Sequence, residues 1–488
     1  MRKCLSIVLC LIVTFLIPSF SLARRGVSSK TQRKIKAVLS QFSTHSIVSL
    51  VVHSVRSGKQ LFSHNGKKTM VPASTLKVIT AIGALDGLAP KSSLETKLLA
   101  TGPIRKGRLL GNLVIVGGGD PSLAMADVGS SLPLKNLLWR WLSAVRKAGI
   151  KEIMGDVVGE ATLFDDQPIS RYAIWEDIGN YYGGVTSSLS FNGNLFHLYL
   201  SSLPKPGTVV KVLGTVPVHT AITTFDNRLR AGPLGSGDNA YIFGSPMSHV
   251  RYLVGTIPPG KESFKIKGSL PNPAFTCAAT LHQKLKKSGL KVLGRPCSTN
   301  VSKRGRKNCQ LDSYRSPTIA ALVKHMNKTS NNVFAEQLLK LLGHKYKGKG
   351  SRTRGLHVLA ERLDELGLKR VGIHLKDGSG LSRYNGITAN FLTKSLIAAA
   401  KKPYYKDLLA SMPISGVDGS LKNRYNSPKL KGRVMAKTGY MERVFALTGF
   451  IKPKSSGMLA FTFIVNDETA PFRLTQQRFR DIALLLVK

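Results

Sequence analysis

Short apolar runs rich in β-branched residues lie near both ends of the chain. Residues 47–55 form one run, a turn follows at Ser57-Gly58, and a second run covers residues 60–63, which together predict a β-hairpin. Near the other end, similar runs are separated by turn residues, and the last apolar segment has helical spacing. These patterns predict strands at residues 433–437, 444–451 and 458–465, and a closing helix at residues 473–487.

Two helical patterns precede the last strands. The first begins at Ser316-Pro317 and the second covers residues 333–342. Apolar positions of the first recur with the 3.6-residue period of a helix: Ile319, Leu322, Val323 and Met326. These helices and the terminal strands are expected to belong to one domain, formed by residues 24–90 and 312–488.

The region between, residues 91–311, has many short β-type runs interrupted by Gly and Pro. Examples are residues 113–116, 196–200 and 209–213. No internal repeat of fixed period is visible, which excludes solenoid and propeller folds. We therefore expect residues 91–311 to form an inserted, mainly β region, divided into two smaller domains.

The N-terminal residues have the pattern of a secretory signal. Arg2 and Lys3 precede an apolar run at residues 4–17, and Ser21-Leu22-Ala23 places small residues at both specificity positions of a signal-peptidase site. This predicts a signal peptide at residues 1–23. A membrane anchor is the weaker alternative, because the run is shorter than the roughly 18 residues that a spanning helix needs. We expect an exported protein, periplasmic or associated with the cell envelope.

The composition adds a strong positive charge. The chain has 488 residues with 72 Lys and Arg against 26 Asp and Glu, so its formal charge is +46, or +44 without the two bases of residues 1–23. Its 42% hydrophobic residues exclude a disordered tail, and its length predicts two or more domains. The charge favours anionic cell-wall or membrane-surface polymers as partners, not nucleic acid. Basic runs at residues 284–307 and 345–354 predict solvated loops.

Ser74 and Lys77 are candidates for a nucleophile and its base. Ser74 starts an apolar helix, and a residue three positions on lies on the same helix face, so Lys77 is expected beside the Ser74 hydroxyl. A hydroxyl needs a base to take its proton, and burial can make lysine such a base by lowering its pKa by up to about 3–5 units. The same spacing at Ser202 and Ser288 does not start an apolar helix. An ordinary helix cap is the alternative for Ser74.

Two further motifs follow in the chain. Ser330-Asn331-Asn332 lies between the two predicted helices, where a hydroxyl and a carboxamide can project from a loop. Lys437-Thr438-Gly439, the only Lys-Thr-Gly of the chain, ends a β run. On an edge strand, Lys437 and Thr438 can meet a carboxylate, and the missing side chain of Gly439 lets a substrate backbone lie against the strand. Taken singly, each motif also fits an ordinary loop or edge strand.

The order of these three elements resembles that of the penicilloyl-serine transferases. A wider set of motifs is similar to the class C low-molecular-mass penicillin-binding proteins, the peptidase S13 family of D-alanyl-D-alanine carboxypeptidases and endopeptidases. The set is Gly117-Gly-Gly-Asp-Pro121, Ser330-Asn-Asn-Val-Phe-Ala-Glu336, Asp377-Gly-Ser-Gly-Leu-Ser-Arg383, Pro413-Ile-Ser-Gly-Val-Asp-Gly419 and Lys437-Thr-Gly439. One departure is Asn331, where the family often carries Asp.

The resemblance covers most of residues 45–488 and implies an α/β (α+β) fold. Its catalytic domain would be serine β-lactamase/transpeptidase-like, with an antiparallel sheet flanked by helices. The gap of 256 residues from Ser74 to Ser330 (330 − 74) holds the insert that marks this class and that compact β-lactamases lack.

The resemblance also implies roles for individual residues. Lys77 would deprotonate Ser74, which attacks the carbonyl between two D-alanines of a peptidoglycan stem peptide and forms an acyl-enzyme. Ser330 would relay the proton to the leaving amine, and Asn332 would contact the substrate amide. Lys437 and Thr438 would bind the terminal carboxylate. The backbone N–H groups of Ser74 and Tyr440 would form the oxyanion hole. Trp175-Glu-Asp177 is similar to a family segment near the active site, so Asp177 is a candidate contact for an amino group of the stem peptide, with an ordinary surface aspartate as the alternative.

Neither a metal nor a cofactor is expected, because no His/Asp/Glu cluster or paired cysteines have ligand spacing. β-Lactam antibiotics are expected as covalent inhibitors. Two alternatives stay open. A serine β-lactamase usually needs a dedicated carboxylate base for deacylation, for which no motif is evident, and a non-catalytic peptidoglycan-binding protein could keep the fold.

Overall fold

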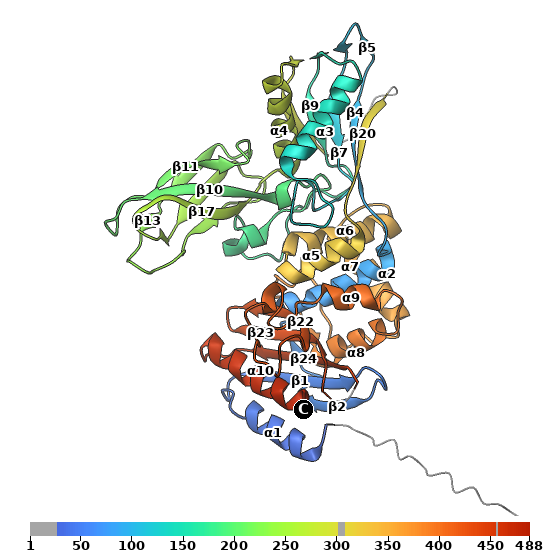
Figure 1. Cartoon of the computed structure of the whole chain (residues 1–488), viewed down its shortest axis with the longest axis vertical. Coiled ribbons are helices and arrows are strands. Elements are labelled where there is room, and N and C mark those ends of the chain that lie inside the picture. The colour runs from blue at the N-terminus through green and yellow to red at the C-terminus, as the bar shows by residue number, and fades with distance from the viewer. Residues whose placement is uncertain (1–26, 301–307, 455–456) are drawn as a thin grey trace, which may run out of the picture.

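The computed structural model describes residues 27–300, 308–454 and 457–488. The predicted signal peptide at residues 1–23 lies outside these residues. Among the residues described, no helix combines the length and apolar character needed to cross a membrane. Figure 1 shows an elongated molecule whose first and last elements lie together in one part, while the middle of the chain forms two further groups of strands.

The terminal elements form a five-stranded antiparallel sheet with the order β2-β1-β24-β23-β22. Its strands are β1 (Ile47–Ser54), β2 (Gln60–His64), β22 (Val434–Met441), β23 (Val444–Ile451) and β24 (Leu459–Asn466). The strands predicted near both chain ends are therefore confirmed. β1 joins the two ends by pairing with β24, and β22, which carries Lys437, lies at the edge as predicted.

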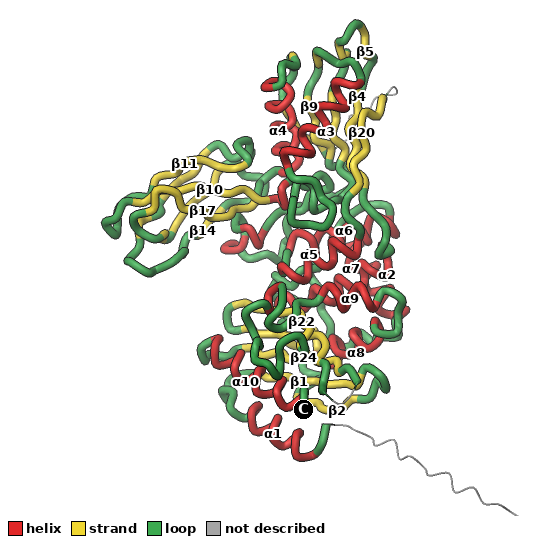
Figure 2. Tube along the Cα trace, viewed as in Figure 1, coloured by secondary structure: helices red, strands yellow, loops and turns green. Residues whose placement is uncertain are grey.

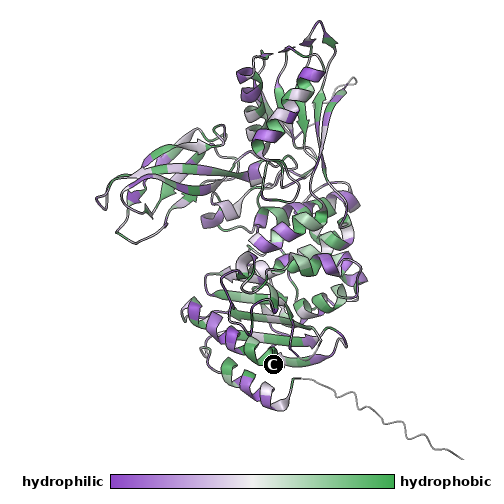
Figure 3. Cartoon of the chain, viewed as in Figure 1, coloured by the Kyte–Doolittle hydropathy of each residue, from purple (hydrophilic) through white to green (hydrophobic). Residues whose placement is uncertain are grey.

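Helices cover both faces of this sheet because its strands are apolar on both sides. Phe463 of β24 lies in one core cluster, covered by α1 (Ser29–Leu39) and α10 (Phe472–Leu486). Its neighbour Ile464 points the other way, into a cluster with α8 (Ala389–Ala399). Figure 3 shows hydrophobic colour along these strands and more hydrophilic colour on the outer helices.

A layer of helices separates the sheet from the insert (Figure 1). It contains α2 (Lys77–Leu88), α5 (Ile319–Thr329), α6 (Asn332–Lys347), α7 (Arg352–Glu365) and α9 (Tyr405–Ser411), with a small ladder of β3 (Thr69–Met70) and β21 (Ile387–Thr388) nearby. Every residue of α2 except Asp86 is buried, which explains why this helix is apolar on all sides. α5 and α6 are the two helices predicted before the last strands. The expected fold class, an antiparallel sheet flanked by helices with a large insert, is confirmed.

The first group of strands in the insert packs against two helices, α3 (Leu134–Lys147) and α4 (Pro273–Lys287). It has a five-stranded sheet, β19-β9-β7-β4-β20, and a four-stranded sheet, β18-β8-β6-β5. The strands are β4 (Glu95–Ala100), β5 (Ile104–Arg105), β6 (Arg108–Leu109), β7 (Leu113–Val116), β8 (Glu152–Ile153), β9 (Val157–Glu160), β18 (Lys291–Val292), β19 (Pro296–Thr299) and β20 (Cys309–Arg315). This half of the insert is thus an α/β structure and not mainly β.

The second group consists of three small sheets, β11-β10-β17, β12-β15-β14 and β13-β16, and extends sideways from the molecule (Figure 2). Its strands are β10 (Leu195–Ser202), β11 (Lys211–Val216), β12 (Thr224–Asn227), β13 (Arg230–Ala231), β14 (Tyr241–Phe243), β15 (Val250–Val254), β16 (Thr256–Ile257) and β17 (Lys261–Ser269). We propose that the two groups are separate modules of the insert. The expected boundary at residue 312 falls inside β20, which pairs with β4 as far as Arg315.

The Gly117-Gly-Gly-Asp-Pro121 motif follows β7 and has a packing role. A Cβ on Gly118 would lie 2.0 Å from the carbonyl oxygen of Glu95, so only glycine permits this close approach. The carboxylate of Asp120 accepts hydrogen bonds from the backbone and the hydroxyl of Ser122, which closes the turn. This motif therefore stabilises the turn that follows β7 in the insert.

Candidate active site

Ser74 lies on a tight turn that leads into α2. The turn is a short 3₁₀ helix, Ala73–Leu76, and α2 begins at Lys77. Ala73 has a φ of 46°, a left-handed conformation that a residue with a side chain adopts only where its surroundings hold it. The turn presents the half-buried Ser74 hydroxyl at the amino end of the helix.

The amine of Lys77 contacts three oxygen atoms. Its Nζ lies 2.9 Å from Ser74 Oγ, 2.5 Å from Asn332 Oδ1 and 2.6 Å from the backbone carbonyl oxygen of Ser379. The amide of Asn332 is oriented by a second hydrogen bond, because its Nδ2 donates to the Tyr182 carbonyl oxygen at 2.8 Å. The Lys77 side chain is completely buried, so these oxygens replace its hydration shell.

These partners decide in which direction a proton can move. The carbonyl oxygens of Asn332 and Ser379 can only accept hydrogen bonds, so they take both N–H groups of a neutral amine. The lone pair of the nitrogen then faces Ser74, whose hydroxyl is the one partner of the three that can donate. The geometry therefore suits a neutral Lys77 that receives the Ser74 proton.

Burial is the main reason why this amine can be neutral. It lowers the pKa of Lys77 to about 7, while the negative charges of Asp377 and Glu336 act in the opposite direction. A buried ammonium loses its hydration, and here that loss outweighs the attraction of the two carboxylates. Near neutral pH, a substantial fraction of Lys77 is thus available as a base.

Ser330 and Asn332 lie where α5 ends and α6 begins. Ser330 ends α5 in a left-handed conformation with a φ of 59°. Asn331 caps α6, because its side chain accepts a hydrogen bond from the Phe334 N–H. Aspartate makes the same cap, so the departure from the family pattern at Asn331 leaves this junction intact. The sharp turn directs Ser330 and Asn332 toward lysines of two different elements.

Lys437 reaches Ser330 from the edge strand β22. Its Nζ donates to Ser330 Oγ at 2.8 Å and to the Thr438 carbonyl oxygen at 2.7 Å. Burial, followed by the positive charges of Lys77 and Arg424, holds the pKa of Lys437 well below its ordinary value. Because both charges that act on it are positive, this position attracts an anion.

Thr438 and Tyr440 continue the same strand. The hydroxyl of Thr438 lies 2.7 Å from that of Ser420, which fixes its position beside Lys437. The Tyr440 side chain is exposed and packs edge-on against Phe472, with ring centroids 4.5 Å apart. The part of Tyr440 that is available to the site is therefore its backbone.

Gly439 is required by the turn that carries Ser74. A Cβ at this position would lie 2.8 Å from the Pro72 carbonyl oxygen and 3.1 Å from both Ala73 Cβ and Ser74 N. This corrects the interpretation that the missing side chain makes room for a substrate backbone, since the protein's own turn takes the space. The close approach places the N–H of Ser74 beside β22, an arrangement that suits an oxyanion hole.

Asp177 lines a pocket together with Asn332 and Ser379. It belongs to a short 3₁₀ turn, Trp175–Asp177, and only 7% of the residue is exposed, so it is not an ordinary surface aspartate. Burial raises the pKa of Asp177 to about 6, an effect that the charge of Arg383 opposes. Its Oδ2 is buried without a hydrogen-bond partner, and such an oxygen favours a donor supplied by a ligand.

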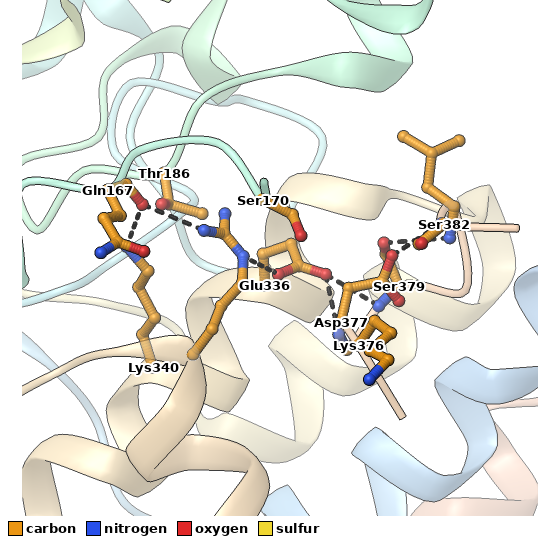
Figure 4. Close-up of polar contacts among 12 residues, drawn as sticks. Gln167, Ser170, Thr186, Glu336, Lys340, Lys376, Asp377, Ser379 and Ser382 are labelled. Carbon is orange, nitrogen blue, oxygen red and sulfur yellow. Dashed lines mark hydrogen bonds and ion pairs between the residues drawn. The ribbon is translucent and has the colours of Figure 1, made fainter. Parts of the chain in front are cut away.

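The loop that supplies the Ser379 carbonyl is held by two carboxylates (Figure 4). Asp377 accepts hydrogen bonds from the backbone N–H groups of Gly380 and Ser382, at 2.8 and 2.7 Å. Glu336 of α6 accepts hydrogen bonds from the two N–H groups that follow Asp377 in the chain. The loop is therefore rigid on both sides of the carbonyl that Lys77 contacts.

Four residues of this site received no role from the sequence patterns: Glu336, Arg352, Asp377 and Ser379. Three of them lie in motifs that carry the family resemblance, so the motifs marked the place without showing the contacts. Arg352 lies in a basic run predicted to be a solvated loop, and that prediction is wrong for this residue. Its side chain is 11% exposed and its Nε lies 2.7 Å from Glu336 Oε2. Within the described ranges, no group of three or more His, Cys, Asp or Glu side chains could hold a metal ion.

Comparisons with known proteins agree with the family resemblance. The sequence model of the D-Ala-D-Ala carboxypeptidase 3 (S13) family matches residues 31–481. A D-alanyl-D-alanine carboxypeptidase of Actinomadura sp. is 28% identical over 470 residues, which cover 94% of this chain and 85% of the relative. The D-alanyl-D-alanine carboxypeptidase DacB of Haemophilus influenzae is 28% identical over 460 residues, which cover 93% of this chain and 90% of the relative.

The solved structures lead to the same group. The crystal structure of penicillin binding protein 4 from Haemophilus influenzae has a TM-score of 0.80 to this chain at 25% identity, and the match covers 93% of this chain and 99% of that protein. A second crystal structure of that protein, complexed with a β-lactam, has a TM-score of 0.76 at 25% identity with the same coverage.

Replacing Gly439 by alanine is expected to lower the free energy of unfolding by about 1–3 kcal/mol, because the added methyl group collides with the turn at Pro72 and Ala73. The measurement is the midpoint of thermal unfolding. Gly457→Ala is the control, since a Cβ there meets no atom within 4 Å. An unchanged midpoint for Gly439→Ala would show that the turn and β22 do not touch in solution.

Proposed function

The chain belongs to the D-Ala-D-Ala carboxypeptidase 3 (S13) family, and from this premise we propose that it hydrolyses the D-Ala-D-Ala bond of peptidoglycan stem peptides through an acyl-enzyme on Ser74. The observation that carries the proposal is the contact between the Ser74 hydroxyl and a buried amine whose other two partners are carbonyl oxygens. This arrangement supplies a nucleophile and a base at neutral pH without a further group.

The first half of the reaction forms the acyl-enzyme. Lys77 takes the Ser74 proton as Oγ bonds to the carbonyl carbon between the two D-alanines, and the carbonyl oxygen gains the negative charge. Ser330, which accepts a hydrogen bond from Lys437, gives its hydroxyl proton to the leaving nitrogen as the C–N bond breaks. The proton that Lys77 took from Ser74 then returns to Ser330, so Lys77 is neutral again for the next step. D-Alanine leaves, and the rest of the stem peptide stays as an ester on Ser74. Water then hydrolyses that ester, with Lys77 again as the base.

The oxyanion and the substrate carboxylate are both bound along β22, and the Ser74 turn supplies one further N–H group for the oxyanion. The N–H groups of Ser74 and Tyr440 stabilise the oxyanion, and one such donor is worth about 2.7–4 kcal/mol in a comparable hydrolase. Lys437 and Thr438 bind the terminal carboxylate. Its negative charge offsets the positive charges of Lys77 and Arg424, which act on Lys437. Asn332 has its Oδ1 on Lys77 and one Nδ2 hydrogen on the Tyr182 carbonyl, so the second Nδ2 hydrogen is the group proposed to contact the substrate amide.

Asp177 is proposed to bind an amino group of the stem peptide. Its buried Oδ2 has no partner, and its pocket opens beside Asn332 and Ser379. An ammonium group placed there would supply the missing donor and favour the ionised carboxylate, whose pKa burial now raises to about 6.

The proposed setting is the outside of the cytoplasmic membrane. The substrate class of the family is peptidoglycan, and the N-terminal pattern predicts export, so we propose a periplasmic or envelope-associated location. β-Lactams are proposed as covalent inhibitors, supported by the β-lactam complex of the Haemophilus influenzae protein. The net charge of +46 also suits anionic wall or membrane-surface polymers as partners.

Ser74→Ala is expected to abolish covalent labelling by fluorescent penicillin, because among the described residues the Ser74 hydroxyl is the one that contacts the Lys77 amine. The readout is the fluorescent band of the protein in a denaturing gel. Ser288→Ala is the matched control. Ser288 has the same Ser-x-x-Lys spacing, but it lies at the C-terminal end of α4 in the insert. Undiminished labelling of Ser74→Ala would remove Ser74 from the mechanism.

The rate of penicillin acylation is expected to rise as the pH increases through about 7. Burial lowers the pKa of Lys77 to about 7, and only its neutral form, which prevails above that pH, can accept the Ser74 proton. The labelling rate constant is measured from about pH 5 to about pH 9, a range in which a base of this pKa titrates. Lys77→Arg, which cannot lose its proton, should remain unlabelled throughout. A flat profile would contradict a lysine base.

Incubation with muropeptides that carry pentapeptide stems is expected to remove one alanine per stem, and mass spectrometry measures the loss. Disappearance of cross-linked dimers in the same digest would add endopeptidase activity. Ser74→Ala serves as the inactive control. Intact muropeptides with rapid turnover of penicillin would favour a β-lactamase instead, and binding without cleavage would favour a non-catalytic wall protein.

A further inference from the structure

A stripe of buried polar side chains runs along α6. Asn332, Glu336 and Lys340 follow one another at intervals of four residues, so they lie on one face of the helix. Lys340 is completely buried and Glu336 is 7% exposed, although such residues seldom enter a core. Each one contacts a segment outside the helix, so this face of α6 is an interface between parts of the molecule.

Glu336 binds the backbone of the loop that faces Lys77. Its Oε1 accepts hydrogen bonds from the N–H groups of Gly378 at 2.8 Å and Ser379 at 2.9 Å (Figure 4). The carbonyl group of the same Ser379 accepts the hydrogen bond from Lys77 Nζ at 2.6 Å. One residue thus connects the Glu336 carboxylate to the amine of Lys77.

The same loop is bound on its other side by α2. Thr80, one turn after Lys77, donates its hydroxyl hydrogen to the Gly378 carbonyl oxygen at 2.6 Å. The carbonyl groups of Gly378 and Ser379 therefore accept hydrogen bonds from α2, and their N–H groups donate to Glu336. Asp377 binds the Gly380 N–H, which belongs to the same peptide group as the Ser379 carbonyl, and Glu336 binds the N–H groups on the other side of Ser379. Without Glu336, this peptide group would be held from one side only, and the Ser379 carbonyl could turn away from Lys77.

Arg352, the first residue of α7, connects Glu336 to the insert. Its Nε donates to Glu336 Oε2 at 2.7 Å, and its two terminal nitrogens donate to the carbonyl oxygens of Gln167 at 3.0 Å and Pro168 at 3.1 Å. Lys340 supports the same segment through hydrogen bonds to Asp165 Oδ1 at 2.7 Å and to the Gln167 carbonyl oxygen. The guanidinium fork thus serves three acceptors at once, which a lysine amine could not match in this geometry.

The segment that Arg352 holds also borders the active-site pocket. Ile169 and Ser170 line that pocket together with Asp177, Glu336 and Arg352. The pair therefore lies between the pocket wall contributed by the insert and the loop that contacts the base. Since both side chains of the pair are nearly buried, removing one charge would leave the other without compensation.

We propose that Glu336 and Arg352 are a positioning pair, in which Glu336 aims the Ser379 carbonyl at Lys77 and Arg352 fastens residues 165–170 of the insert beside the active site. The pair acts through its hydrogen bonds to Ser379, Gln167 and Pro168, which place groups of the site, although both side chains also border the pocket. The inference rests on the proposed function, because it assigns the pair a role in the reaction of Ser74 and Lys77.

The two members of the pair differ in the step that they affect. Loss of the Glu336 contacts displaces the carbonyl that orients the base, so it should slow acylation itself. Loss of the Arg352 contacts to Gln167 and Pro168 loosens the pocket wall, so it should weaken substrate binding. A merely structural pair would instead change stability without this division between kcat and KM.

Glu336→Gln is the first test. Glutamine keeps one oxygen for the Gly378 and Ser379 N–H groups but turns an NH₂ toward Arg352, so it cannot serve both sides. Penicillin acylation of the full chain is expected to slow by as much as about 100-fold, the cost of a small misplacement of a catalytic group. Circular dichroism and the unfolding midpoint establish that the variant is folded.

The pH profile of acylation provides a second readout. The charged groups that face Lys77 are Glu336 from α6, Asp377 from its loop and Lys437 from β22. Glu336 is one of the two carboxylates that raise the pKa of Lys77, so its neutralisation should move the rise of the acylation rate to lower pH. Glu336→Asp keeps the charge but shortens the side chain, so its rate should fall while its profile stays in place.

Glu361→Gln is the matched control. Glu361 of α7 pairs with Lys347 of α6 at 2.8 Å, so it also joins these two helices. Both side chains of this pair are exposed, and Glu361 makes no contact with the 377–382 loop. This variant should be acylated at the wild-type rate. Wild-type rate and profile in Glu336→Gln would overturn the inference, and if that variant does not fold, a wild-type rate in Glu336→Asp would do so.

Arg352→Lys tests the contact to the insert. It keeps a positive charge opposite Glu336 but loses the fork that binds Gln167 and Pro168. The KM for a pentapeptide substrate should rise several-fold, with the pH profile of acylation unchanged, and an unchanged KM would refute this half of the inference. If the wild type itself is not labelled by penicillin, the proposed function fails; if it is labelled and the variants behave like it, only the positioning pair fails.

Discussion

The buried amine of Lys77 is the constraint on which the rest of the active site depends. An amine enclosed by protein is tolerated only when its hydrogen-bonding capacity is used and its charge can be lost. The site meets both conditions with two carbonyl oxygens and the hydroxyl of Ser74. Two glycines let neighbouring backbone segments come close enough to enclose this amine. Gly439 allows β22 to touch the Ser74 turn, and Gly380, where a Cβ would lie 2.0 Å from the Ala73 carbonyl oxygen, does the same for the 377–382 loop.

Two buried lysines share this site, and their charges are coupled. The positive charge of Lys77 is one cause of the low pKa of Lys437, so the two amines disfavour each other's protonated form. In the proposed reaction, the terminal carboxylate of the substrate binds at Lys437 and favours the charged form of that amine. The negative charge of the bound carboxylate offsets the positive charge that Lys437 gains, so the two amines can coexist in this site with only one net charge between them and the substrate.

The insert is part of the active site and not an appendage to it. The Tyr182 carbonyl oxygen orients Asn332 of α6, and the carbonyl oxygens of Gln167 and Pro168 bind Arg352 of α7, so three backbone groups of the insert contact the two helices beside the site. All three contacts use backbone oxygens, which any sequence would supply if the chain followed the same path. These contacts depend on the path of the backbone, and Lys340 of α6 adds one side-chain contact, to the Asp165 carboxylate. A compact relative without the insert would need other groups to hold this face of the helix.

The sequence by itself determined the features whose causes are local. Short apolar runs predicted the five strands of the central sheet, and the spacing of Ser74 and Lys77 placed the amine by the hydroxyl because three residues make nearly one helical turn. The insert was harder, since its many short strands led to a mainly β prediction, whereas one half of it also contains the long helices α3 and α4. Only the tertiary structure decided the contacts between distant segments. Ser379 lies 302 residues from Lys77, and Arg352 lies 185 residues from the Gln167 carbonyl that it binds. A basic run looks the same whether its arginine is solvated or buried, because burial depends on which loop the folded chain brings against it.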